Sequence, residues 1–169
     1  VFVLYDDVQY DKNGWRNRNR ILTANGPAWL TVPVRLTGQD FPPILEVAID
    51  PSKDWRRKHR ISLEQAYAKA PFFSTVYPAL ARVLEQDWEF LIDLDLAMLR
   101  ALVDLLGMPW KVQRSSELGV PGQKTARLIG LCQKLGASDY LTGDAARSYL
   151  DESAFQDLGV KVHWHGYLH

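Results

Sequence analysis

Two neighbouring carboxylates, Asp6 and Asp7, directly follow an apolar run at the start of the chain. The apolar run predicts a buried strand, so both side chains would stand at its end, where α/β sheets commonly bind ligands. Adjacent carboxylates can bind Mg²⁺, or one can act as a general base whose pKa is tuned by the other. The competing interpretation is structural: Asp6 and Asp7 cap a turn or pair with nearby arginines.

Ten residues after Asp6, arginine and asparagine begin to alternate strictly. On a strand, this alternation places Arg16, Arg18 and Arg20 on one face and the two asparagines on the other. Guanidinium groups can hold phosphate or carboxylate through paired hydrogen bonds, although a solvated face with weak ion pairs would also explain the arginines. An asparagine that faces a core without a hydrogen-bond partner costs about 1–3 kcal/mol of stability. Asn17 and Asn19 therefore favour a strand that borders a cleft.

Two further passages from loop or strand into helix lie in the last third of the chain. Lys124 opens a predicted helix after a loop that contains Ser116, and helix starts attract anions. The glycine spacing before Lys124 excludes a Walker A loop, which leaves a phosphate or carboxylate site or plain helix capping. In the second passage Gly143 would let a ligand approach the backbone, and Tyr149 offers an aromatic face; a tight turn with a core tyrosine is the alternative.

Histidine and cysteine give weaker indications. His163, His165 and His169 suggest a metal site, but satisfied or exposed histidines are the preferred interpretation, and no metal ligand is predicted. His59 lies in a basic helical run that is typical of a solvated face. Cys132 falls in an apolar helical stripe and is predicted to be a core residue.

The elements that must position these residues form, by prediction, a single α/β domain with a mixed sheet over residues 1–169. A β-hairpin is expected near the N-terminus, because two β-type runs flank Asn25 and Gly26, with Pro27 lengthening the loop. The middle segment, residues 52–107, is expected to be mainly helical. Strands alternating with helices after it predict β-α-β units with parallel pairing in the C-terminal part.

Composition limits the classes of partner. Twenty acidic and twenty basic side chains cancel, so no overall field favours nucleic acid or an anionic membrane, and neither is expected as a partner. No apolar run reaches the about 18 residues of a transmembrane helix, so no membrane insertion is predicted. One cysteine fits a reducing compartment, and we expect a cytoplasmic protein. The chain starts at Val1 without a methionine, and we expect it to be cut at both ends.

The stretch YDDVQYDKNGWRNRNRI, followed by NGPAWLTVPV, resembles the WbqC-like family of bacterial proteins. Later stretches agree in the same order: WRRKHRI, YAKAPF, SSEL and KTARLIGLCQKLGASDYLTGDAARSY. The resemblance covers nearly the whole chain and implies a place in surface-polysaccharide (O-antigen) biosynthesis. Some family members are labelled as glycine or aminoacyl transferases that act on amino sugars. The family pattern carries over most directly to Gln9, Trp15, Arg18 and Asn19.

The leading hypothesis is therefore a transferase that moves an acyl or aminoacyl (glycine) group onto an amino sugar or nucleotide sugar. Asp7 would be the general base or a metal ligand, and Mg²⁺ is a candidate cofactor. The expected substrate-binding residues are Gln9, Trp15, Arg18, Asn19, Ser116, Lys124, Gly143 and Tyr149, with Asp6 and Asp7 catalytic. Trp15 would stack on the sugar, and Arg18 and Lys124 would hold phosphate or carboxylate. The alternative is a non-catalytic protein that binds the same glycan or a partner enzyme.

Overall fold

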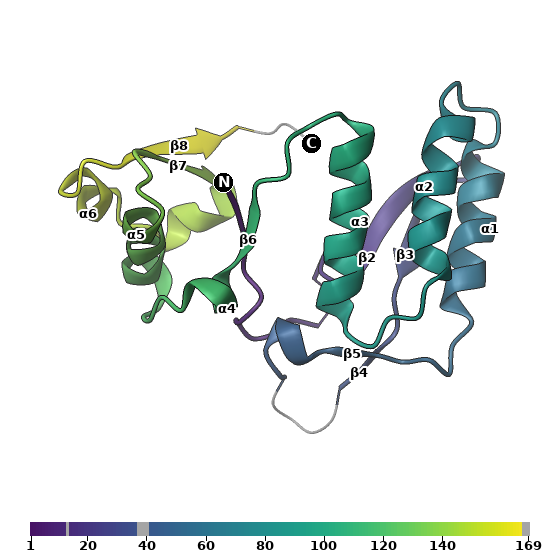
Figure 1. The fold of residues 1–169 in the computed structure, drawn as a ribbon, viewed down its shortest axis with the longest axis horizontal. Coiled ribbons are helices and arrows are strands. Elements are labelled where there is room, and N and C mark those ends of the chain that lie inside the picture. The colour runs from purple at the N-terminus through teal and green to yellow at the C-terminus, as the bar shows by residue number, and fades with distance from the viewer. Residues whose placement is uncertain (13, 37–40, 167–169) are drawn as a thin grey trace. The chain divides into compact units, whose positions relative to one another are not determined.

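The structure, a computed structural model, describes residues 1–12, 14–36 and 41–166. Helices and short strands are mixed throughout, which confirms the predicted α/β class (Figure 1). The chain forms two compact units, Val1–Val112 and Gln113–His169. Within the described residues, no helix combines the length and apolar character needed to cross a membrane.

The N-terminal hairpin is confirmed. It consists of β2 (Arg18–Thr23) and β3 (Gly26–Thr31), paired antiparallel with Thr23 opposite Gly26. Gly26 has φ = +99°, a conformation that favours glycine and closes a two-residue loop. The prediction that Pro27 lengthens this loop is wrong, because Pro27 lies inside β3 opposite Leu22. The N–H of Leu22, the residue opposite Pro27, donates to the Tyr67 hydroxyl at 2.9 Å and so has an acceptor outside the hairpin.

The strand pattern differs from the prediction at two places before the hairpin. The first strand, β1 (Phe2–Leu4), is present, but Val1 and Phe2 are 71% and 55% exposed, so the expectation of a buried strand is wrong. The second strand begins at Arg18, not at Arg16, and Arg16 lies in a turn. Arg16 therefore does not share a strand face with Arg18 and Arg20, as the alternation had predicted.

Residues 6–10 run beside residues 42–45 in the first unit. Leu45 N–H donates to the Asp6 carbonyl at 2.8 Å, and Ile44 N–H donates to the Val8 carbonyl at 2.9 Å. After these contacts the chain forms a 3₁₀ turn, η1 (Ile44–Glu46), followed by β5 (Ala48–Ile49). β5 pairs antiparallel with β4 (Val34–Arg35).

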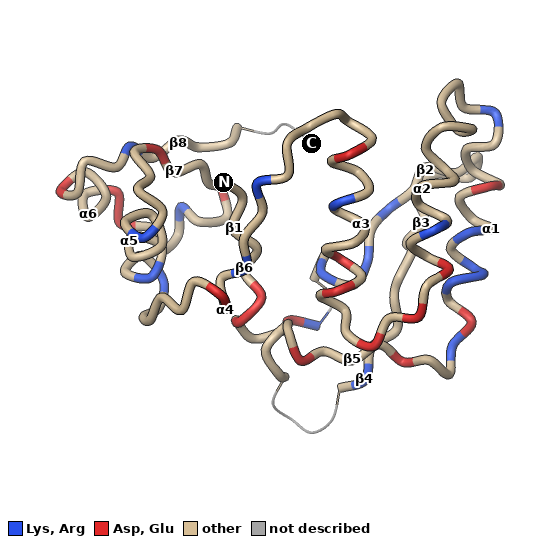
Figure 2. Tube along the Cα trace, viewed as in Figure 1, with Lys and Arg blue, Asp and Glu red and all other residues tan. Residues whose placement is uncertain are grey.

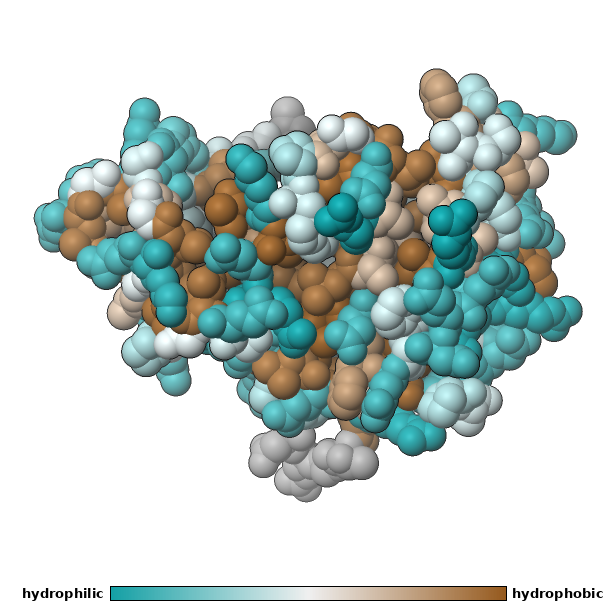
Figure 3. Space-filling model, viewed as in Figure 1, coloured by the Kyte–Doolittle hydropathy of each residue, from teal (hydrophilic) through white to brown (hydrophobic). Residues whose placement is uncertain are grey.

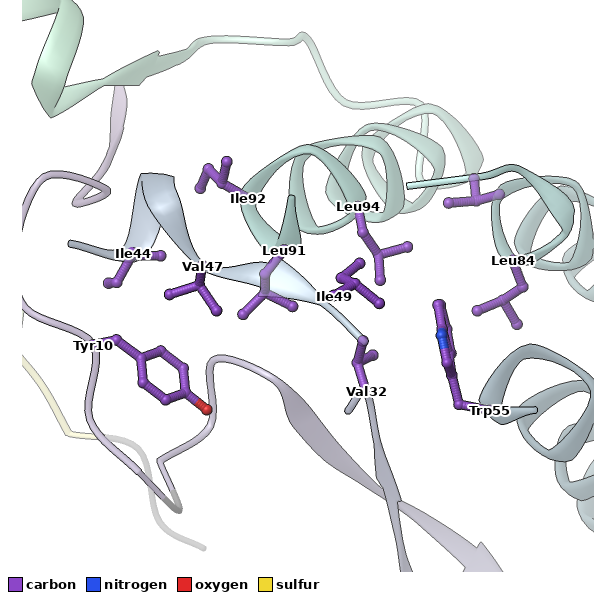
Figure 4. Close-up of a cluster of buried hydrophobic side chains, with 11 residues drawn as sticks. Tyr10, Val32, Ile44, Val47, Ile49, Trp55, Leu84, Leu91, Ile92 and Leu94 are labelled. Carbon is purple, nitrogen blue, oxygen red and sulfur yellow. The ribbon is translucent and has the colours of Figure 1, made fainter. Parts of the chain in front are cut away.

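The mainly helical middle is also confirmed. It contains α1 (Trp55–Tyr67), α2 (Phe73–Glu85) and α3 (Leu91–Leu105). Apolar side chains at helical spacing place Leu91 and Leu94 of α3 against Val47, Ile49 and Val32 (Figure 4). Lys and Arg side chains are frequent along α1, and its outer surface is hydrophilic (Figures 2 and 3).

The second unit contains the predicted parallel pair. β7 (Asp139–Gly143) and β8 (Lys161–His165) pair in parallel, and η2 (Asp144–Ser148) and α6 (Glu152–Gln156) connect them. The helix α5 (Lys124–Lys134) begins at the predicted lysine. Residues 115–118, expected in a loop, form the short helix α4 (Ser115–Leu118), which directly follows β6 (Val112–Arg114). The apolar cluster of this unit includes Phe155, Val160 and Cys132, so the core placement of Cys132 is confirmed.

Candidate functional site

A pocket of about 250 Å³ lies in the first unit, between the start of the hairpin and the three helices. We call it the arginine–asparagine pocket. Its wall consists of Trp15, Arg16, Asn17, Arg18, Asn19, Leu30, Val32, His59, Leu63, Leu80, Leu84, Leu94, Asp95 and Met98. Three of the residues predicted to bind substrate, Trp15, Arg18 and Asn19, are thus brought together around one hollow. The polar wall comes from residues 15–19 and the apolar wall mainly from the helices.

Hydrogen bonds to backbone carbonyl groups fix the polar wall. The Asn17 side-chain amide donates to the Val32 carbonyl at 2.9 Å, and Val32 N–H donates to the Asn17 carbonyl at 2.8 Å. Arg18 Nε donates to the Gly14 carbonyl at 3.1 Å, and Arg16 pairs with Asp11. Because these bonds hold the turn, the guanidinium groups have defined positions before any ligand arrives.

The two hairpin arginines also lie over two indole rings. The Arg18 guanidinium carbon is 4.3 Å from the centre of the Trp29 ring, and that of Arg20 is 5.2 Å from the Trp15 ring. The Trp15 and Trp29 rings are 4.9 Å apart, and both side chains are about half exposed. We call these four residues the tryptophan–arginine stack. Cation–π contacts of this kind hold the charged groups beside the pocket without neutralising them.

Asp95 of α3 lines the same pocket and is the most unusual titratable group in it. It lies four residues after Leu91 and three before Met98, on the face of α3 that otherwise carries the apolar stripe. Asp95 is half-buried, and this partial burial raises the pKa of its carboxyl group from 3.8 to about 7, because it disfavours the charged form. No described residue forms a hydrogen bond or ion pair with this carboxyl group in the structure. A carboxyl with a pKa near neutrality can accept and return a proton at the pH of a cell.

His59 of α1 contributes a second buried polar group to the wall. Its side chain is 8% exposed, its Nε2 lies 3.1 Å from the Thr31 carbonyl, and its ring meets Trp55 edge-on. Burial lowers the pKa of His59, and the hydrogen bond with Thr31 opposes this only in part. His59 is therefore neutral at pH 7 and donates from Nε2. The prediction that it faces solvent is wrong.

The charges of the pocket act together on a neighbouring phenol. Burial raises the pKa of Tyr10, while the charges of Arg16 and Arg18 lower it and that of Asp95 raises it. Guanidinium groups and a carboxyl therefore act within the same small region. The pocket can hold a ligand that offers an anion to the arginines and a proton donor to Asp95.

The predicted catalytic pair lies elsewhere in the first unit. Asp6 is fully buried, Asp7 is partly buried and Gln9 is exposed, with Gln9 forming an isolated bridge to Pro43. None of the three is part of the pocket wall. Their predicted roles stay predictions.

The other predicted binding residues lie in the second unit. Ser116 is in α4 and Lys124 begins α5, with φ = +48° at Lys124. The Thr125 hydroxyl donates to the Tyr149 carbonyl at 3.1 Å, which ties the start of α5 to the segment that carries Tyr149. Gly143 has open space around it, since an added Cβ would meet no atom within 4 Å. Three of these residues, Lys124, Gly143 and Tyr149, therefore lie on exposed parts of the unit.

The histidines of the second unit do not form a metal site among the residues that the structure describes. His163 Nε2 is 2.7 Å from Asp139 Oδ1, and no group of three or more potential ligands occurs in the described ranges. His169 lies outside them. His163 is thus a partnered histidine, as preferred from the sequence.

Sequence reasoning missed Asp95 and His59. Both have a signal that could have been used. Asp95 occupies a position of the helical stripe where an apolar residue is expected, and His59 is one turn after Trp55 on the face of α1 that packs inward. A polar residue on an apolar stripe is the kind of exception that marks a candidate site.

Comparison with known proteins supports the resemblance noted from the sequence. A family model described as the WbqC-like protein family matches residues 1–169. The chain is 40% identical over 167 residues to the uncharacterized protein Rv1507c of Mycobacterium tuberculosis, covering 98% of this chain and 72% of that protein. No solved structure matches the chain.

Proposed function

Because this chain belongs to the WbqC-like protein family, we propose that it is a cytoplasmic enzyme of bacterial surface-polysaccharide (O-antigen) biosynthesis. Its substrate would be an amino sugar or a nucleotide sugar, to which it transfers an acyl or aminoacyl (glycine) group. The observation that carries the proposal is the arginine–asparagine pocket, where fixed guanidinium groups surround a hollow that contains the carboxyl group of Asp95. The single cysteine, buried and reduced, fits the cytoplasm.

Each part of the pocket suits one part of such a substrate. Arg18, with Arg16 beside it, holds a phosphate or carboxylate, because guanidinium groups form paired hydrogen bonds with these anions. Asn19 offers an amide to sugar hydroxyl groups, and the half-exposed Trp15 ring offers a face for stacking on the sugar.

Asp95 is the proposed proton acceptor for the transfer. The acceptor's hydroxyl or amino group would give its proton to the Asp95 carboxylate while it attacks the carbonyl carbon of the acyl donor. The bond from that carbon to the leaving group then breaks, and the leaving group takes the electron pair and a proton. A pKa near 7 fits both halves of this proton transfer at neutral pH. Asp7 remains a second candidate for the same role, with Asp6 beside it.

The remaining predicted binding residues are kept as proposals to be tested singly: Gln9, Ser116, Lys124, Gly143 and Tyr149. Mg²⁺ is kept as a candidate cofactor, since Asp6 and Asp7 supply the oxygen ligands that it prefers. Substitution of each residue in turn, followed by the binding measurement below, shows which of them contacts the ligand.

The experiment is a thermal-melting screen of the protein against nucleotide sugars, ATP with Mg²⁺, and aminoacyl donors. A ligand at a hundred times its dissociation constant stabilises by about 2.7 kcal/mol, which raises the melting temperature measurably. We expect a nucleotide sugar to raise it, and Arg18→Ala to abolish the rise.

Two further variants make the screen specific. Asn19→Asp keeps the size of the side chain and the acceptor for the Arg20 N–H but adds a negative charge, so it should weaken anion binding. Arg82→Ala, at an exposed position near the end of α2 and outside the pocket wall, should leave binding unchanged. Equal loss of binding in Arg82→Ala and Arg18→Ala would contradict the proposed site.

A non-catalytic glycan-binding protein is the second candidate, and the tryptophan–arginine stack favours it. Two half-exposed indole rings beside two guanidinium groups suit recognition of an acidic sugar without any reaction. Asp95→Asn and Asp7→Asn separate the two candidates. An enzyme loses turnover in one of these variants while binding persists, whereas a pure binding protein has no turnover to lose.

A further inference from the structure

A second hollow, wholly apolar, lies beside the arginine–asparagine pocket at the end of the α1–α2 pair. It has a volume of about 280 Å³, and we call it the aromatic groove. Its wall consists of Leu63, Tyr67, Ala70, Pro71, Phe72, Phe73, Val76, Tyr77 and Leu80. Phe72 is 73% exposed, which is unusual for a large apolar side chain.

The polar atoms of the groove are occupied. The Tyr67 hydroxyl accepts the Leu22 N–H, and the Tyr77 hydroxyl bonds to Glu64. Burial and Glu64 together raise the pKa of Tyr77 to about 12, so its phenol stays neutral at pH 7. The Phe73 and Tyr77 rings stack 4.7 Å apart. The groove therefore offers hydrocarbon and ring surface to a ligand, without a charge.

The two hollows share part of their wall, because the same helical faces run along both. On α1, His59 lines the pocket, Leu63 lines both hollows and Tyr67 lines the groove, at intervals of four residues. On α2, Val76 lines the groove, Leu80 both and Leu84 the pocket, again four residues apart. Residues four apart lie on one helix face, so the two stripes lead from the aromatic groove to the polar pocket over about 12 Å.

We propose that the aromatic groove takes the aliphatic chain of a ligand whose anionic head occupies the arginine–asparagine pocket. The inference rests on the proposed function for the head group and adds the class of ligand, a single-chain amphiphile. A neutral groove that adjoins a pocket lined by two arginines and two asparagines, with Asp95 as its one carboxyl group, has the polarity of such a molecule. The shared residues Leu63 and Leu80 would lie where the chain meets the head.

Monoalkyl phosphates test this directly, with affinities measured by calorimetry for ethyl, butyl, hexyl and octyl phosphate below their micelle concentrations. Each methylene that enters the groove should tighten binding by about fourfold, since burying one contributes about 0.8 kcal/mol. The gain should stop once the groove is full. Equal affinity for ethyl and octyl phosphate would overturn the proposal.

Variants of the groove show whether the gain in affinity with chain length arises there. Val76→Asp places a charge in the groove and should remove the dependence on chain length while ethyl phosphate still binds. Val76→Trp, which fills the groove with an apolar side chain, should do the same and guards against misfolding of the aspartate variant. Leu106→Asp, at the 71% exposed residue that follows the last residue of α3, is the control and should keep the dependence. A dependence that persists in both Val76 variants contradicts a chain in the groove.

The head group is tested separately from the chain. Arg18→Ala should weaken every alkyl phosphate by a similar factor and leave the gain per methylene intact. If the chain-length gain appears but Arg18→Ala has no effect, the groove binds chains and the proposed head site is wrong, which overturns the amphiphile as stated. If sedimentation shows a dimer that Val76→Asp converts to monomer, a second copy of the chain occupies the groove, and the proposal fails.

Discussion

Two aspartates show how differently the two units treat their polar groups. Asp139, at the start of β7, accepts hydrogen bonds from the Ser138 hydroxyl and from His163, and these hold its pKa below the ordinary value. Asp95, in the arginine–asparagine pocket, has no such partner among the described residues, and burial raises its pKa to about 7. The Asp139 carboxylate is thus hydrogen-bonded by its neighbours, whereas the half-buried Asp95 carboxyl has no such bond among the described residues.

This difference shows that position 95 lowers the stability of the folded protein. Burying an unpaired carboxyl is unfavourable, so a sequence under no other constraint would place an apolar residue at position 95. A ligand that brings a proton donor would compensate the carboxyl, whereas the Asp139–His163 pair needs nothing further. The contrast between Asp95 and Asp139 therefore points to the arginine–asparagine pocket as the place to look for a ligand.

The largest effect is expected for Asp95→Leu. The pKa of Asp95 rises from 3.8 unfolded to about 7 folded, so stability is lost as the pH rises through this interval. At about 1.4 kcal/mol for each tenfold change in proton affinity, the loss amounts to at most about 4 kcal/mol. Asp95→Leu should therefore stabilise the protein at pH 8 by a substantial part of this and change little at pH 4. Urea unfolding at both pH values measures it, with Asp93→Asn on the same helix as control.

His59→Ala should have the opposite effect. It removes the hydrogen bond to Thr31 and the edge contact with Trp55, and we expect a loss of about 2 kcal/mol at pH 8. Burial lowers the pKa of His59 below 6.5, so the wild-type protein loses stability as the pH falls below 6.5. The variant should not show this loss of stability below pH 6.5. An unchanged slope below pH 6.5 in urea titrations would show that His59 is not buried as described.

Trp29→Ala tests the tryptophan–arginine stack. The indole lies opposite Arg20 in the hairpin and under the guanidinium of Arg18, so we expect a loss of about 1 kcal/mol. The same substitution should also weaken binding of an acidic sugar. Thermal unfolding with and without ligand separates the two effects, and Trp88→Phe, outside the stack, controls for general loss of a tryptophan.

Asp139→Asn should give the smallest change. Its carboxyl is exposed, and exposed ion pairs contribute little. Because the pKa of Asp139 is lowered on folding, its stabilisation is present above pH 3.8 and is lost as the pH falls further. The variant should therefore be slightly less stable than wild type at pH 7 and equal to it at pH 2. A larger effect than that of Asp95→Leu would reverse the comparison between the two units.

Local sequence signals were sufficient for much of the fold. The hairpin around Asn25 and Gly26, the three middle helices and the parallel pair near the C-terminus all follow from periodicity and turn chemistry. The start of β2 could not be predicted in this way. Alternation of polar residues does not show that the Asn17 side chain donates a hydrogen bond to the Val32 carbonyl and so holds a turn. Burial of the first strand likewise depends on tertiary neighbours that an apolar run does not reveal.

The site was predictable only in part. Trp15, Arg18 and Asn19 were predicted together because dense polarity beside a predicted strand is visible in the sequence, and they line one pocket. Asp95 lies about eighty residues later, on a different helix, and only the folded chain brings it to the same pocket. Its place on an apolar stripe was visible, but a single aspartate in a helix is usually solvated, so the pattern alone does not distinguish the two cases.

In the free protein, the Asp95 carboxyl group of the pocket has no hydrogen-bond or ion-pair partner among the described residues. A carbon-13 NMR titration of the Asp95 side-chain carboxyl, assigned with the Asp95→Asn variant, measures this without any ligand. We predict a midpoint near pH 7 for Asp95, with Asp139 titrating below its ordinary value in the same experiment. A midpoint near pH 4 for Asp95 would mean that its charge is solvated or paired, and would contradict the proposed role of this carboxyl group.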